Sequence, residues 1–426
     1  MTRELRRVAI VAANRIPFAR SNGVYAKVSN HDMLVAALQG LIDRTRLTGE
    51  RLGEVVAGAV LKHSRDFNMT REAVLSTTLA AETPAYDIQQ ACGTGLEAAI
   101  LVANKIALGQ IEAGIAGGVD TTSDAPLAVN DDLRKILLEL NRSRTMKQRL
   151  NALKPFRPAM LAPEIPRNGE PRTGLSMGDH GALMAETWGI SREDQDELAV
   201  HSHRNLAAAY EQGFFADLIT PFQGLSRDQN LRPEASMEKM ASLNTCFGKG
   251  PGATMTPGNS TPLTDGASCV LLATEAWANA HQLPVLAWWG DAETAAVDFF
   301  NKKEGLLMAP VYAVPRLLAR RGLALQDFDF YEIHEAFAAQ VLCTLKAWED
   351  AEYCRDVLGL SAPLGAIDRS RLNVRGSSLA AGHPFAATGG RIIATLSKLL
   401  NEKGAGRGLI SICAAGGQGV VAILEK

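Results

Sequence analysis

Residues 88–109 read IQQACGTGLEAAILVANKIALG, and residues 374–400 read VRGSSLAAGHPFAATGGRIIATLSKLL. Each stretch passes from a short extended run, through a turn of small residues, into a long helix with apolar residues at helical spacing. An apolar strand that closes on glycines follows each one, AGIAGGVD at 113–120 and GLISICAAGG at 408–417. The chain therefore repeats one plan of extended run, turn, helix and strand.

A second pair of segments extends this repeat toward the N-terminal side of each copy. Residues 47–60, LTGERLGEVVAGAV, align without a gap with residues 323–336, LALQDFDFYEIHEA, at a shift of 276 positions. Strands that alternate with helices of this length predict an α/β fold built from two βαβ-type halves with mixed, largely parallel sheets.

The repeat also divides the chain into units. We predict an N-terminal half of residues 1–122 and 249–277, and a C-terminal half of residues 278–426. The residues between, 123–248, form an inserted loop domain in this interpretation. Prolines interrupt regular structure there, in PFRPAMLAPEIPRNGEPRTG at 155–174.

Composition excludes several classes of protein. The chain has 426 residues, 46% of them hydrophobic, and a formal net charge of -2, which gives no indication of a nucleic-acid partner. No apolar run approaches the roughly 20 residues that span a bilayer, and the N-terminal apolar run is too short for a signal peptide. The six cysteines lack the short spacings of a disulfide framework. We therefore expect a soluble, cytoplasmic protein with reduced thiols.

Two cysteines and two histidines carry the chemistry: Cys92 in QQACGTG, His334 in EIHEAF, His383 in AAGHPFAATG and Cys413 in SICAAGGQG. A thiol attacks as the thiolate, and we expect a helix N-terminus and His383 to lower the pKa of Cys92. A second thiol can move a proton at neutral pH. Because equivalent strand ends of two packed halves face one crevice, we predict a single site for acyl transfer through a thioester.

The other cysteines and histidines have simpler interpretations. Free cysteine commonly packs as a small hydrophobe, and we expect this of Cys246, Cys269, Cys343 and Cys354. We predict no metal site, because no ligand constellation is formed by His31, His63, His180, His201 and His203. The last two lie on a polar helix pattern, where we expect them at the surface.

A basic segment lies in the predicted insert. Residues 134–157 carry eight lysines and arginines against one acid, Glu139. A helix is predicted by the apolar spacing of Leu133, Ile136, Leu137 and Leu140. The segment is either a solvated basic face that covers the core, or a surface for a phosphate-bearing ligand, an acidic partner protein or a membrane.

The chain resembles the thiolases over essentially its whole length. The resemblance rests on the ordered motifs RIPFAR, ACGTG, AGIAGGVD, MGDHGALMAETWGISREDQDELAVHSH, GNSTPLTDGA, HEAFAAQ, GHPFAATGGRI and CAAGGQG. It implies duplicated halves in a five-layered α-β-α-β-α core. It also implies that Cys92 is the acyl-accepting nucleophile, His383 the base that activates it, and Cys413 the acid/base at the α-carbon of the second acyl group.

Two motifs depart from the commonest thiolase pattern. The usual Asn-Glu-Ala-Phe is His334-Glu335-Ala336-Phe337 here, and the usual Cys-x-Gly-Gly-Gly begins Cys413-Ala414-Ala415. Both variants resemble the β subunits of fatty-acid oxidation trifunctional complexes. The resemblance then gives His334 the role of facing the thioester oxygen, directly or through a water. It places Thr261, Met177 and Ala415 against the substrate.

The resemblance implies an enzyme that cleaves medium or long 3-ketoacyl-CoA with CoA, through an acyl-Cys92 intermediate, in β-oxidation. The alternative is an acetyl-CoA C-acetyltransferase that makes or cleaves acetoacetyl-CoA. A decarboxylating ketoacyl synthase needs no second thiol, so Cys413 disfavours it, and a non-catalytic lipid carrier or structural subunit is more remote. We expect no cofactor, since CoA is a substrate. Expected partners are a second copy, as a homodimer or dimer of dimers, and a hydratase/dehydrogenase α subunit, with peripheral membrane contact as an option.

Overall fold

The structure, a computed structural model, describes residues 5–250, 252–302 and 304–426. Its strands are β1 (Ala9–Arg15), β2 (Ala19–Arg20), β3 (Glu54–Ala57), β4 (Ala85–Asp87), β5 (Ala113–Asp120), β6 (Thr264–Ala273), β7 (Ala287–Ala296), β8 (Phe330–Ile333), β9 (Arg407–Ala414) and β10 (Gln418–Glu425). They join in the order β4-β3-β5-β6-β1-β7-β10-β9-β8, and β2 pairs with β6 beside this path. The first five strands in this order come from the N-terminal side of the chain, with the last four from the C-terminal side.

The element bounds confirm the duplication. Strand β8 occupies the positions of β3 shifted by 276, and each lies parallel to the next strand of its own half, β9 or β5. Helices α3 (Thr94–Ala107) and α14 (Thr388–Lys403) both begin at a threonine, and β5 and β9 follow them at one common shift of 294 positions. The two halves are therefore copies of one helix and strand unit.

The expectation of largely parallel sheets is wrong. Of the nine strand pairings among the described residues, six are antiparallel and three are parallel. Strands β9 and β10 are joined by a turn of three residues, Ala415 to Gly417, and so short a connection can only reverse the chain. The halves meet where β1 pairs with β7, at Ala9 with Trp288 and Ile10 with Ala287.

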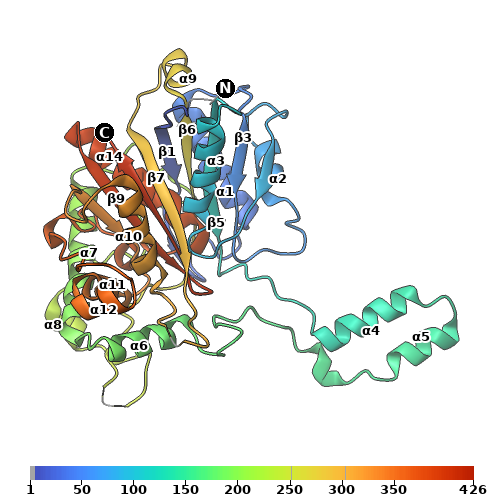
Figure 1. The fold of residues 1–426 in the computed structure, drawn as a ribbon. Coiled ribbons are helices and arrows are strands. Elements are labelled where there is room, and N and C mark those ends of the chain that lie inside the picture. The colour runs from blue at the N-terminus through green and yellow to red at the C-terminus, as the bar shows by residue number, and fades with distance from the viewer. Residues whose placement is uncertain (1–4, 251, 303) are drawn as a thin grey trace.

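Helices and strands form five layers, as the resemblance implied (Figure 1). The outer helices of the N-terminal half are α1 (Asn30–Thr45), α2 (Met69–Leu75) and α9 (Glu275–Ala280). Those of the C-terminal half are α10 (Ala309–Arg321), α11 (Ala338–Glu349) and α12 (Ala351–Asp356). Helices α3 and α14 contact each other and strands of both halves, so they form the central layer.

Three apolar clusters fill the spaces between the layers, and β10 shows how one strand serves two of them. Val420, Ala422 and Leu424 belong to the central cluster around α3 and α14. Val421 and Ile423 point to the opposite face and pack under α10. Because successive side chains alternate between faces, a strand buried on both faces needs the continuous apolar run VVAIL.

Glycines allow the central helices to touch at their N-termini. A Cβ atom added to Gly389 would lie 2.2 Å from the backbone nitrogen of Leu96, and one added to Gly95 would lie 2.6 Å from the carbonyl oxygen of Ala386. Only glycine permits this approach. The contact brings the turn that carries Cys92 against the turn that carries His383.

The residues between β5 and β6 form two different parts. One part contains α6 (Met177–Thr187), α7 (Arg192–Glu211) and α8 (Met237–Ala241), and it packs through α6 and α7 on α11 and on α13 (Ser378–Ala381). His203 is buried, contrary to expectation, while His201 is exposed as predicted. The limits of the units at 122, 248, 249, 277 and 278 stay predictions.

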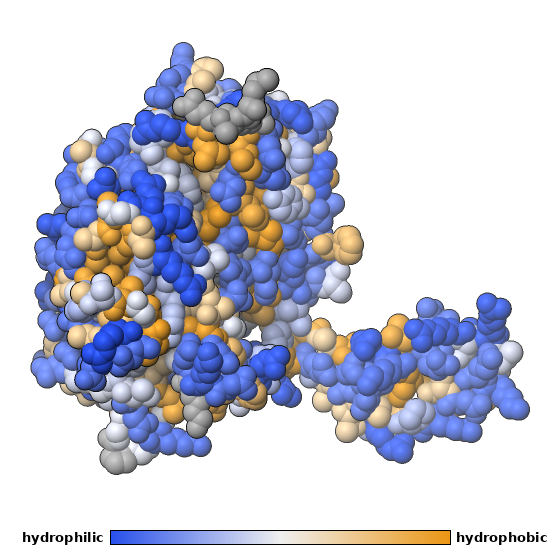
Figure 2. All heavy atoms as spheres, in the orientation of Figure 1, coloured by the Kyte–Doolittle hydropathy of each residue, from blue (hydrophilic) through white to orange (hydrophobic). Residues whose placement is uncertain are grey.

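The other part is an arm formed by α4 (Asp131–Arg142), α5 (Met146–Leu153) and the short helix η1 (Pro158–Leu161). The arm stands away from the body of the molecule, and its base is closed by an antiparallel bridge between Ala128 and Glu164 (Figure 1). The predicted helix is confirmed, but a basic face that covers the core is wrong. Ile136 is the one buried residue of α4 and α5, and apolar side chains show among the charged ones on the arm (Figure 2).

Candidate active site

Cys92 lies in a tight turn just before α3. The preceding residue, Ala91, has a φ of 47°, in the left-handed region that residues with a side chain rarely adopt. The hydroxyl of Thr94 holds this turn, because it accepts the N–H of Gln90 at 2.8 Å and donates to the carbonyl oxygen of Ala91 at 2.7 Å. A strained, clamped turn fixes the direction of the Cys92 side chain.

His383 approaches Cys92 from the other half of the chain. Its Nε2 atom lies 3.1 Å from Cys92 Sγ, and its Nδ1 atom lies 2.5 Å from the hydroxyl of Thr388. The backbone N–H of His383 donates to Thr264 Oγ1 at 2.8 Å. Gly382, with a φ of 103°, turns the chain so that this contact can form. The imidazole is therefore held between a hydroxyl and the thiol.

His334 follows β8 and lies beside His383. The two ring centroids are 4.1 Å apart and the rings are inclined by 47°. Nδ1 of His334 lies 2.7 Å from Ser378 Oγ. Nε2 is buried and has no hydrogen-bond partner among the described residues. This nitrogen is therefore available to a group that enters the site.

Cys413 lies one residue before the end of β9 and is buried. Burial raises the pKa of Cys413 well above its ordinary value, and the nearby Cys92 sulfur adds to this shift. In the turn that follows β9, the backbone N–H of Ala415 faces the Cys92 sulfur and favours its thiolate. The structure thus brings together all four residues that the sequence singled out, the two cysteines and the two histidines.

The expected lowering of the Cys92 pKa is wrong for the site without substrate. Burial raises the pKa of Cys92 to about 12, although the N–H of Ala415 opposes this shift. Burial, with the charge of Arg391, lowers the pKa of His383 to about 3. The pair is therefore a neutral thiol and a neutral imidazole, and the thiolate forms by transfer of the proton across the hydrogen bond.

A cavity of about 610 Å³ opens onto Cys92. Met177 and Ala415 line it, as the resemblance implied, together with residues 165–171 of the insert. Thr261 is not among its lining residues; its hydroxyl donates instead to the carbonyl oxygen of Ala336 at 3.0 Å. The cavity is large enough to hold part of a thioester substrate.

Glu170 is a lining residue that the sequence did not indicate. Its carboxylate accepts the N–H of Gly416 at 2.6 Å and ties the insert to the turn after Cys413. The surrounding sequence, PRNGEPRTG, has the composition of an ordinary loop, so no signal marked this residue.

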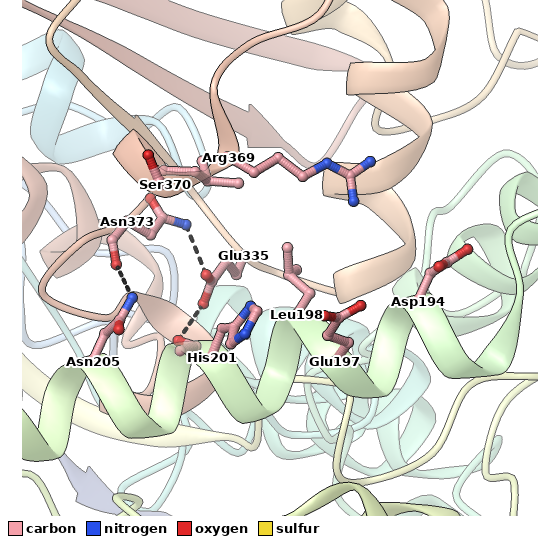
Figure 3. Close-up of a pocket in the computed structure, with 11 residues that line it drawn as sticks. Asp194, Glu197, Leu198, His201, Asn205, Glu335, Arg369, Ser370 and Asn373 are labelled. Atoms are coloured by element: carbon pink, nitrogen blue, oxygen red, sulfur yellow. Dashed lines mark hydrogen bonds between the residues drawn. The ribbon is translucent and has the colours of Figure 1, made fainter.

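Glu335, next to His334, does not line the cavity at Cys92. Its carboxylate accepts from Ser202 Oγ at 2.7 Å, from Asn373 Nδ2 at 2.7 Å and from the N–H of Leu379 at 3.1 Å. A second cavity of about 440 Å³ lies over these bonds, between α7 and residues 369–373 (Figure 3). Glu335 therefore braces the segment behind His334 and takes no part in the site itself.

Cys92, His334 and His383 form the one group in the described part of the chain that could hold a metal ion, with ligand atoms within 4.8 Å of one another. The same atoms are the ones needed for thioester chemistry. The absence of a resident metal stays a prediction.

Two matches to family models identify the chain. Residues 8–276 match the thiolase N-terminal domain, and residues 283–426 match the thiolase C-terminal domain. The chain belongs to the thiolase family. The resemblance seen in the motifs is confirmed, and so is the α/β fold of two related halves, by the thiolase structures that it matches.

Individual thiolases match over almost their whole length. The 3-ketoacyl-CoA thiolase of Pectobacterium atrosepticum is 40% identical over 100% of this chain and 98% of its own. The 3-ketoacyl-CoA thiolase of Yersinia enterocolitica is 38% identical with the same coverage.

Two crystal structures match with a TM-score of 0.81. Human mitochondrial 3-ketoacyl-CoA thiolase in complex with CoA is 27% identical over 99% of this chain and 98% of its own. The acetyl-CoA acetyltransferase of Bacillus anthracis is 28% identical over 99% of both chains. The chain is thus an acyltransferase of a family that acts on CoA thioesters.

Proposed function

We propose that this thiolase cleaves 3-ketoacyl-CoA with CoA, giving acetyl-CoA and a shortened acyl-CoA in fatty-acid β-oxidation. The observation that carries the proposal is the contact of Cys92 Sγ with His383 Nε2 at 3.1 Å, beside a second buried thiol, Cys413. One thiol accepts the acyl group, and the other manages the proton of the leaving carbanion.

In the first half-reaction, the Cys92 proton passes to Nε2 of His383 and the sulfur attacks the 3-keto carbon. The oxyanion collapses and the bond between the α-carbon and the 3-carbon breaks. The electron pair left on the α-carbon takes the proton of Cys413, which releases acetyl-CoA and leaves acyl-Cys92. In the second half-reaction, the Cys413 thiolate takes the proton of the CoA thiol, and the CoA sulfur attacks the acyl group. The Cys92 sulfur leaves and recovers its proton from His383.

Donors for the developing oxyanions surround the sulfur. The N–H groups of Ala415 and of Cys92 itself face the Cys92 sulfur and favour its charged form. An oxygen on a carbon bonded to that sulfur lies within reach of the same donors. Donors fixed before the reaction stabilise charge that develops in the transition state. No step requires a group other than these residues and CoA, so we propose that the enzyme has no further cofactor.

The names of the Pectobacterium and Yersinia relatives support 3-ketoacyl-CoA as the substrate. The Bacillus structure, named for acetyl transfer, supports acetoacetyl-CoA as the alternative. Thiolysis rates of the purified protein with acetoacetyl-CoA, a medium-chain and a long-chain 3-ketoacyl-CoA distinguish the two. We expect the longer substrates to have the higher kcat/KM. Activity on acetoacetyl-CoA alone would favour the alternative, and no thiolysis of any substrate would exclude both.

We propose that the enzyme works as a homodimer or dimer of dimers, paired with a hydratase/dehydrogenase α subunit in the cytoplasm. The arm supports association with a larger surface. It exposes apolar side chains, Leu137, Leu138, Met146, Leu150 and Leu153, among its basic residues. An acidic partner protein or an anionic membrane surface matches this combination better than a free phosphate group does. Among the described residues, no helix is both long enough and apolar enough to cross a bilayer.

A further inference from the structure

The hydrogen bonds behind His334 decide which of its nitrogens carries the proton. Nδ1 lies 2.7 Å from Ser378 Oγ, and the same oxygen lies 2.8 Å from Nη2 of Arg391. Ser377 Oγ, 3.2 Å from Nη2, is the other partner of this guanidinium nitrogen. All four residues are buried, Arg391 with 3% of its surface exposed.

Arginine has donors and no acceptor, so the Arg391 guanidinium donates to Ser378 Oγ. The serine hydroxyl can then use its own hydrogen in a second bond, and Nδ1 of His334 is the other hydrogen-bond partner of this oxygen among the described residues. Nδ1 therefore accepts. Burial and the nearby His383 and Arg391 lower the pKa of His334 well below its usual value, so the ring is neutral and holds one proton. That proton lies on Nε2.

The reverse arrangement is worse on two counts. If Nδ1–H donated to Ser378, the hydroxyl hydrogen would be buried without an acceptor among the described residues, which is unfavourable for a buried polar group. Nε2 would then present a lone pair to the site. A lone pair repels the negative oxygen that forms on the thioester carbon.

The neighbouring ring needs the other tautomer. His383 must accept the Cys92 proton at Nε2, so its own proton lies on Nδ1 and is donated to Thr388 Oγ1. Among the described residues, no arginine hydrogen-bonds to the hydroxyl of Thr388, whereas Arg391 does so at Ser378. The two histidines therefore differ in what their hydroxyl partner already accepts, an arginine N–H at Ser378 and no side-chain donor at Thr388 among the described residues.

We propose that Ser378 and Arg391 are positioning residues that hold His334 as the Nε2–H tautomer, so that this proton faces the thioester oxyanion directly or through a water. The proposal rests on the proposed thiolytic function for the identity of the oxyanion. The tautomer itself is a property of the resting enzyme and is measured without substrate.

The direct test is the ¹⁵N chemical shift of the histidine side chains in full-length, [¹⁵N]histidine-labelled enzyme. His334→Asn identifies the His334 signals by their loss. We expect a protonated Nε2 and an unprotonated Nδ1 at His334 in the wild type, and partial or complete loss of this preference in Ser378→Ala. A protonated Nδ1 at His334 in the wild type would overturn the proposal, whatever the enzyme's activity. Thiolysis that persists in Cys92→Ala would instead contradict the proposed function and leave the tautomer measurement valid.

A double-mutant cycle tests the consequence for catalysis. Ser378→Ala should lower kcat by about 10- to 100-fold, toward the lower end of the loss caused by removing one oxyanion donor. In a His334→Asn background the same change should cost less than about 2-fold, because a carboxamide has its own N–H donors. Equal losses in both backgrounds would show a merely structural role.

The matched control is Ser397→Ala. Ser397 is a buried serine of α14 whose hydroxyl donates to the Ala394 carbonyl. The kcat of this variant should stay within about 2-fold of the wild type.

Discussion

The imidazole rings of His334 and His383 lie against each other, with centroids 4.1 Å apart. Each ring turns one nitrogen toward the space beside Cys92 and the other toward a buried hydroxyl, Ser378 for one and Thr388 for the other. Burial keeps both rings neutral by lowering both pKa values. Two neutral imidazoles in contact can therefore divide two tasks, with one accepting the thiol proton and one facing the oxyanion.

Cys92→Ala removes the proposed nucleophile. We expect loss of covalent acyl-enzyme and a fall in thiolysis by several orders of magnitude, because no other group replaces the attacking sulfur. Circular dichroism should show an unchanged fold. Intact-mass and peptide mass spectrometry after mixing with 3-ketoacyl-CoA locates the acyl group. Cys246 is the exposed cysteine and the natural competitor for alkylation by iodoacetamide, so an acyl group found on Cys246 would contradict the assignment.

Cys413→Ala should separate the two thiols. Acyl transfer to Cys92 is expected to continue, because His383 and the N–H of Ala415 remain in place. Exchange of the α-protons of acetyl-CoA with deuterated water should fall by about 100- to 10,000-fold, the usual effect of removing an acid/base group. Proton NMR of acetyl-CoA measures the exchange. A rate equal to that of the wild type would exclude Cys413 as the acid/base.

Acid should destabilise the fold through buried histidines. His203 accepts the Arg232 N–H at 3.2 Å, and burial, with the charge of Arg232, lowers its pKa from 6.5 to about 4. Between these values the unfolded chain binds the extra proton, so the free energy of unfolding falls as pH falls below 6.5, by at most about 1.4 kcal/mol per pH unit for one histidine. Urea unfolding at several pH values in this window measures how steeply the free energy of unfolding changes with pH. His203→Gln should make this dependence shallower, and an unchanged slope would show that His203 titrates normally.

Gly389→Ala tests the contact of the central helices. The new methyl carbon would meet the Leu96 backbone nitrogen at 2.2 Å, and neither backbone can move without displacing the Cys92 or His383 turn. We expect a loss of about 3 kcal/mol or more, at the upper end of overpacking, together with a fall in kcat. The control is Gly252→Ala, because no atom lies within 4 Å of its added carbon. Thermal unfolding compares the two, and similar Tm values would mean that the helices separate easily.

The sequence predicts the parts of this molecule that repeat. The shift of 276 positions places β3 over β8 because both strands must bury apolar residues between the same layers. The glycine turns around Cys92 and His383 mark the site for a related reason, since a side chain exposed at a strand end needs small neighbours. The repeat does not reveal whether neighbouring strands are parallel or antiparallel. That depends on how segments distant in the sequence pair, as β6 does with β5.

The supporting residues of the site leave no comparable pattern. Ser378 lies 44 positions from His334 in the chain, and the two meet only because α13 folds back beside the end of β8. Arg391 lies in an apolar helix, where a single basic residue is usually exposed, yet it is buried. Glu170 sits in a proline-rich loop. Each acts through hydrogen bonds between segments that are separate in the sequence, and spacing along the chain cannot reveal such bonds.

The arm gives the last prediction. Ion pairs within the arm neutralise only part of its charge. Asp131 pairs with Arg134 and Lys135, while the basic residues nearer the tip form no ion pair with the described residues. Replacing Arg142, Arg144, Lys147 and Arg149 with serine should weaken binding to an α subunit or to anionic vesicles. The effect should shrink as salt rises, since salt screens such charges beyond about 8–10 Å. Co-sedimentation with vesicles and pull-down with the α subunit, each at two salt concentrations, measure it. A variant with lysine at the three arginine positions keeps the charge and should bind normally.

Because the arm stands away from the body of the molecule (Figure 1) and none of the four replaced residues lines the cavity at Cys92, thiolysis by the serine variant should stay unchanged. If both associations are equal to those of the wild type at low salt, the arm is only a solvated projection.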